Sequence, residues 1–63
     1  MLLQVPPSSF VDAYCELQRI IPLSDYRYTA DPRGGIINID TDDVIMNKQQ
    51  RRQFFMWKMR FVG

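Results

Sequence analysis

The residues of this chain that could take part in chemistry are one cysteine and one group of carboxylates, and neither is arranged for catalysis. Histidine is absent from the 63 residues, so Cys15 has no imidazole to activate it as a nucleophile. Because Cys15 is placed beside a stripe of apolar residues at helical spacing, we expect it to be a small buried side chain. A general base at neutral pH would have to be a carboxylate, a lysine or a perturbed cysteine. We therefore expect no enzyme and no catalytic residues.

The carboxylate group consists of Asp40, Asp42 and Asp43. Three carboxylates can hold Mg²⁺ or Ca²⁺, yet their spacing does not supply the ligand positions of an EF-hand loop. Aspartate is also a preferred residue in turns and at helix starts, and we favour that interpretation. Glycine-rich patterns that bind phosphates are absent as well, and so short a chain has little room for a substrate pocket. We expect no metal, no cofactor and no small-molecule substrate.

The charges are separated along the chain. All seven acids precede residue 44, and only three arginines accompany them, which leaves this part with a net charge of −4. From residue 44 onward the chain has no acid and a net charge of +5, supplied by Lys48, Arg51, Arg52, Lys58 and Arg60. The formal total of +1 therefore hides a strongly dipolar chain.

Four aromatic residues lie among these cations: Phe54, Phe55, Trp57 and Phe61. Cations interleaved with aromatic rings are typical of nucleic-acid surfaces, where they neutralise phosphates and stack on bases. Alternatively, the aromatic residues form the core, and the separated charges bring copies of this chain, or this chain and another protein, together. We favour a protein-interaction module, either a subunit of a larger assembly or an inhibitor that docks on another protein, with nucleic-acid binding as the alternative. The candidate contact residues are Lys48, Arg51, Arg52, Trp57, Lys58 and Arg60.

The length predicts a single domain with a thin core. Surface scaling for 7.5 kDa gives ~4,200 Å² for the folded chain and ~10,900 Å² for the unfolded chain. Burying ~4,000 Å² of apolar surface contributes ~100 kcal/mol, and ordering the chain costs ~95 kcal/mol. One cysteine and no histidine exclude an internal disulfide and the usual zinc sites. Burial against another protein, or against copies of the same chain, is the leading explanation of how the fold is stabilised.

The clearest predicted element is an amphipathic helix from about residue 9 to residue 20 or 21. Its apolar residues recur at helical spacing. Ser9 with Asp12 is a weak form of a capping box, and Pro22 ends the helix. Residues 26–30 and 36–40 alternate as two strands of a β-hairpin, and Gly34 or Gly35 can take a positive φ in the turn between them.

The last third of the chain is ambiguous. Phe55, Trp57, Met59 and Phe61 alternate with their neighbours, so we favour a strand over residues 54–62, after a short strand at residues 44–46 and a polar turn. A long closing helix capped by Thr41 is the alternative, although residues 47–53 offer it no apolar face. The predicted fold is α+β: one N-terminal amphipathic helix packed on a small antiparallel β-sheet, made of the hairpin and a C-terminal strand. Residues 1–5 add an edge strand or an arm that docks on a neighbour.

No stretch of the sequence approaches the ~18 to 20 apolar residues of a membrane span, and residues 1–7 lack the features of a signal peptide. We expect a soluble protein of a reducing compartment, the cytoplasm, with no membrane contact. In its size and its lack of catalytic groups the chain is similar to the small accessory proteins of bacteriophages. That resemblance implies host cytoplasm or virion. The partner's identity and the oligomeric state stay open from the sequence.

Overall fold

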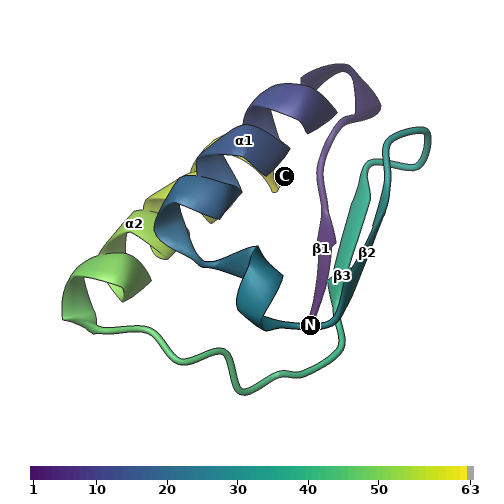
Figure 1. Ribbon diagram of the computed structural model, residues 1–63. Helices are drawn as coiled ribbons and strands as arrows, with labels where there is room; N and C mark the ends of the chain where they lie inside the picture. The colour runs from purple at the N-terminus through teal and green to yellow at the C-terminus, as the bar shows by residue number, and fades with distance from the viewer. Residues whose placement is uncertain (63) are drawn as a thin grey trace.

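The computed structural model describes residues 1–62, which form a three-stranded antiparallel sheet with two helices on one side of it (Figure 1). The elements in chain order are β1 (Leu2–Gln4), α1 (Phe10–Ile20), β2 (Tyr28–Asp31), β3 (Ile36–Ile39) and α2 (Lys48–Phe61), with short 3-10 turns at Pro7–Ser9 and Leu23–Asp25. The predicted α+β class, with the N-terminal helix packed on the sheet, is confirmed.

The sheet has the order β1-β3-β2, so β3 lies in the centre and is antiparallel to both neighbours. Ile37 pairs with Leu3 on one side and with Ala30 on the other. Leu3, Ile37 and Ile39 are buried beneath the helices, because alternate side chains of a strand point to the same face. The predicted hairpin is confirmed, and of the two alternatives for residues 1–5 the edge strand is the one observed.

The hairpin turn supplies the positive φ that its glycines predict. Gly35 has φ +66°, a backbone conformation that glycine adopts without steric cost. The Asp31 side chain accepts a hydrogen bond from the Arg33 amide at 3.0 Å, as in an Asx turn. The Val5 amide donates to the Gly35 carbonyl at 2.7 Å. This last bond joins the end of β1 to the hairpin turn.

Helix α1 has the predicted bounds, and it buries Phe10, Ala13 and Leu17. The Ser9 side chain makes no capping hydrogen bond, so the weak capping box expected there does not form. The prediction that Cys15 is buried is wrong, because its side chain is exposed. Cys15 follows Ala13 by two positions, which is about 200° of helix rotation, and it therefore lies on the side of α1 that faces away from the core.

The predicted strand over residues 54–62 is also wrong. Residues 48–61 form α2, and residues 44–46 have no regular secondary structure. Phe54 and Trp57 are buried at helical spacing, and Phe61, four residues further on, is partly buried. The helix alternative is the one observed, although it begins after Asn47 rather than after Thr41. The alternation of Phe55, Trp57, Met59 and Phe61 is a coincidence of composition.

A capping box determines where α2 begins. The Asn47 side chain accepts from the Gln50 amide, and the Gln50 side chain accepts from the Asn47 amide, both at 2.8 Å. These two bonds satisfy amide groups that the first turn of a helix leaves without partners. Residues 47–53 can be helical without an apolar face because this cap, and the Gln50 side chain that donates to the Ile20 carbonyl at 3.1 Å, hold the first turn.

The two helix starts offer a matched test of capping. We expect Asn47→Ala to lower the free energy of unfolding by about 1 kcal/mol, because it removes a side-chain cap. Ser9→Ala should change that free energy by only a few tenths of a kcal/mol, since Ser9 makes no side-chain cap to lose. Urea unfolding followed by circular dichroism measures both values. Equal losses in the two variants would contradict the assigned caps.

Candidate interaction surface on the second helix

Helix α2 is held on the molecule by its inner face. The Trp57 side chain is 1% exposed, and its indole Nε1 donates to the Ala13 carbonyl of α1 at 2.9 Å. The Phe54 and Trp57 rings are stacked with centroids 5.8 Å apart. Since the inner face is committed to the core, the opposite face of α2 has a defined orientation toward solvent.

The outer face of α2 carries three large apolar side chains that are exposed. Phe55 is 60% exposed, Met56 58% and Met59 73%. Met59 lies four residues after Phe55 and three after Met56, so the three side chains are neighbours on the helix surface. We call these three residues the α2 patch. Single exposed apolar residues are common on protein surfaces, whereas interaction sites present contiguous groups of them.

Cations surround the α2 patch. Arg52 precedes Phe55 by three residues and Met56 by four, and Arg51 precedes Phe55 by four, which places both arginines beside the patch. Lys48 is one further turn away. All five cations predicted as contacts belong to α2, and the sequence of this helix contains no acid. Four of the five lie without an ion pair in the described part of the chain: Lys48, Arg51, Arg52 and Lys58.

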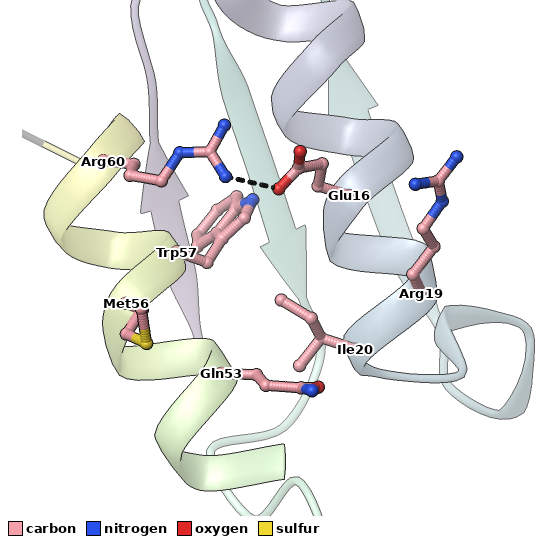
Figure 2. Close-up of a pocket in the computed structure, with 7 residues that line it drawn as sticks. All are labelled: Glu16, Arg19, Ile20, Gln53, Met56, Trp57 and Arg60. Carbon is pink, nitrogen blue, oxygen red and sulfur yellow. Dashed lines mark hydrogen bonds and ion pairs between the residues drawn. The ribbon is translucent and has the colours of Figure 1, made fainter. Parts of the chain in front are cut away.

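The fifth cation is paired across the groove between the helices. Arg60 Nη1 lies 2.9 Å from Glu16 Oε2 on α1, and Figure 2 shows this pair spanning the groove above the Trp57 ring. Both side chains are substantially exposed, so we expect the pair to add little stability. Its consequence is electrostatic, because the Glu16 carboxylate neutralises the cation that is closest to α1.

The groove itself encloses about 380 Å³, and Arg19, Ile20, Gln53 and Met56 line it together with that pair and Trp57 (Figure 2). Small-molecule sites use buried polar groups to orient a ligand. The polar group of Trp57 already donates to Ala13, and no buried side-chain polar atom lacks a partner in the described residues. The polar groups that line the groove, such as those of Arg19 and Gln53, are on exposed side chains, so the groove lacks the buried polar group that orients a small ligand.

The remaining candidate groups contribute to the fold. Asp42 Oδ1 lies 3.0 Å from the amino group of Met1, which also donates to the Ile39 carbonyl at 2.6 Å. Residues 1–62 contain no group of three His, Cys, Asp or Glu side chains that could hold a metal ion. The Tyr14 and Tyr28 hydroxyls are 2.6 Å apart, and this hydrogen bond, together with partial burial, raises the pKa of Tyr14. The tyrosine pair ties α1 to β2.

Comparisons with protein-family models, with curated proteins and with solved structures give no match. Within residues 1–62, no helix is long and apolar enough to cross a membrane.

The structure brings five of the six predicted contact residues to the surface of one helix and places the sixth, Trp57, in the core. The sequence did not reveal the α2 patch, because Phe55 and Met59 were placed with Trp57 on one face of a predicted strand. A signal for it does exist in the sequence. Six of the eight residues from 54 to 61 are apolar, and a helix that is apolar all round is one that becomes covered on every side.

Proposed function

We propose that this chain is a small, non-enzymatic protein-interaction module that binds through the outer face of α2, as a subunit of a larger assembly. The observation that carries the proposal is the exposure of Phe55, Met56 and Met59 side by side on a helix whose other face is locked into the core. Protein interfaces combine an apolar centre with a polar rim in which arginine is enriched. Arg51 and Arg52 supply such a rim to the α2 patch.

The total surface supports the same proposal. The chain exposes 4686 Å², compared with the ~4,200 Å² that scaling gives for a monomer of this mass. A specific interface removes about 800 Å² from each partner. Covering the α2 patch would bring the exposed surface below the value that is usual for an isolated chain of this size.

Nucleic-acid binding is the second candidate, and it rests on the four unpaired cations of α2. Single-stranded nucleic acids bind where aromatic side chains present their ring faces to successive bases. Among the aromatic side chains of α2, only Phe55 is largely exposed. Phe54 and Trp57 are buried and cannot stack on a base. The two methionines of the patch have no ring, but they suit an adaptable apolar contact with a protein.

The compartment that we propose is the cytoplasm. Cys15 is an exposed, free thiol, and exposed thiols persist in compartments that are kept reducing.

Photo-crosslinking tests the contact surface. A benzophenone amino acid replaces Met59 in one variant, and in a control variant it replaces Asn38, which is exposed on the opposite face of the sheet. On irradiation of the cells that produce the protein, we expect a covalent adduct with a protein from position 59 and none from position 38. Adducts from position 38 alone, or an adduct from position 59 that nuclease removes, would contradict the proposal.

A further inference from the structure

We propose that the outer face of α2 binds the segment of residues 40–46 from a second copy of this chain, so that copies associate head to tail. This inference rests on the proposed function and names its partner. The segment of residues 40–46 is called the acidic segment below.

The acidic segment has the side chains that would complement α2. It contains Asp40, Asp42 and Asp43, all exposed, followed by Ile45, which is 83% exposed and the most exposed large apolar residue among those described. An apolar side chain next to two acids without an ion pair, Asp40 and Asp43, matches an apolar patch next to three such cations, Lys48, Arg51 and Arg52. Complementary charges of this kind select the partner and fix the register of a contact.

The lengths of the two surfaces are also compatible. The acidic segment has no regular secondary structure and joins β3 to α2 along one edge of the molecule (Figure 1). Seven extended residues span up to about 23 Å, and the 14 residues of α2 form a helix about 21 Å long. The segment bends at Asp42, where the Asp43 amide donates to Thr41 Oγ1 at 3.0 Å, so it is shorter than this limit and can follow part of the outer face of the helix.

The acidic segment cannot reach the outer face of its own α2. The Asp40 amide donates to the Arg27 carbonyl at 2.8 Å, and the Ile45 amide donates to the Tyr26 hydroxyl at 3.1 Å. The capping box at Asn47 then begins the helix immediately after the segment. Folding back along α2 would break these bonds, so the contact forms between copies.

A symmetric contact between two α2 helices would have no complementary charge. Each α2 has five cations and no acid, and a two-fold contact would place these like charges opposite each other. A contact between two different surfaces is heterologous, and copies joined in this way form a ring or an open chain. This geometry favours an assembly subunit over an inhibitor.

Two complementary variants test the contact. The first, Arg52→Glu with Phe55→Ser, disables the α2 face and keeps the acidic segment. The second, Asp43→Lys with Ile45→Ser, disables the acidic segment and keeps the α2 face. All four side chains are exposed, so both variants should retain the circular dichroism spectrum of the wild type. Asp42 stays unchanged because it pairs with the Met1 amino group.

Light-scattering masses then give the result. We expect the wild type to form multimers whose mass rises with concentration, and each double variant alone to have the 7.5 kDa mass of one chain, with association weakened about 100-fold. An equimolar mixture of the two variants should form a dimer and nothing larger, because it contains only one pair of intact surfaces. A control variant, Val11→Ser with Asp12→Lys, changes an exposed apolar residue and an acid on α1 and should behave as the wild type.

Two outcomes would overturn the head-to-tail contact: a wild type that has the mass of one chain at every concentration, or variants whose mixture does not form the dimer. In either case an adduct between position 59 and a different protein would leave the proposed function standing. The two experiments therefore distinguish a wrong partner from a wrong contact surface.

Discussion

Trp57→Ala should leave most of the protein unfolded at room temperature. The substitution removes the largest fully buried side chain of the core, together with its stacking on Phe54 and its hydrogen bond to the Ala13 carbonyl. Truncating a buried tryptophan costs about 3–5 kcal/mol, and a core of this size rarely supplies more than about 3–5 kcal/mol of net stability. Loss of the helical circular dichroism signal at 25 °C, and of a cooperative thermal transition, is the expected observation.

Phe55→Ala is the matched control, because it truncates an aromatic residue of the same helix that is mostly exposed. We expect its free energy of unfolding to stay within about 0.5 kcal/mol of the wild type, while binding through the α2 face is lost. If instead Trp57→Ala kept the wild-type transition and lost only the partner, Trp57 would be a contact residue and its place in the core would be wrong.

Gly35→Ala should produce the second large effect. Gly35 has φ +66°, and an added Cβ would press against the backbone carbonyl of Val5, far inside van der Waals contact. A side chain at positive φ is strained, and the Val5 carbonyl cannot move away while the Val5 amide is bonded to the Gly35 carbonyl. We expect a loss of about 3 kcal/mol or more, with β1 released from β3. Hydrogen exchange of the β1 amides should accelerate more than that of α1.

Gly34→Ala, one residue earlier, is the control for this strain. Gly34 does not have a positive φ, and its added Cβ would lie 2.9 Å from Asp31 Oδ2. This exposed side chain can turn aside at the cost of its hydrogen bond from the Arg33 amide. We expect a loss of about 1 kcal/mol or less. Similar losses of unfolding free energy in the two variants would mean that the end of β1 does not lie against Gly35.

The parts of the fold that the sequence predicted are those with local signals. Helix α1 has a single apolar stripe and a proline just after its end, and the hairpin has a turn in which one glycine takes a positive φ. Helix α2 has no such single stripe, because Phe55, Met56 and Met59 place apolar residues on its solvent face as well. Its period was therefore hidden by the same residues that make the surface a candidate for binding.

The candidate site was predictable in its charge and not in its apolar part. The cations from Lys48 to Arg60 are visible as a block without acids, and the structure confirms only that one helix carries them all. Which aromatic residue faces solvent depends on the packing of Trp57 against Ala13, a contact between residues 44 positions apart. No local pattern in the sequence reveals that contact. The exposure of Cys15 was not predictable either, because it depends on which side of α1 meets the sheet.

Association of copies is measured by the light-scattering mass of the purified wild-type chain leaving a sizing column, with absorbance at two wavelengths to detect nucleic acid. We predict a mass above 7.5 kDa that rises with concentration, contains no nucleic acid and falls toward one chain near 1 M salt, where the Debye length is about 3 Å. A single-chain mass at every concentration would contradict the head-to-tail contact, and a complex whose absorbance shows bound nucleic acid that salt releases would contradict the proposed protein-interaction function.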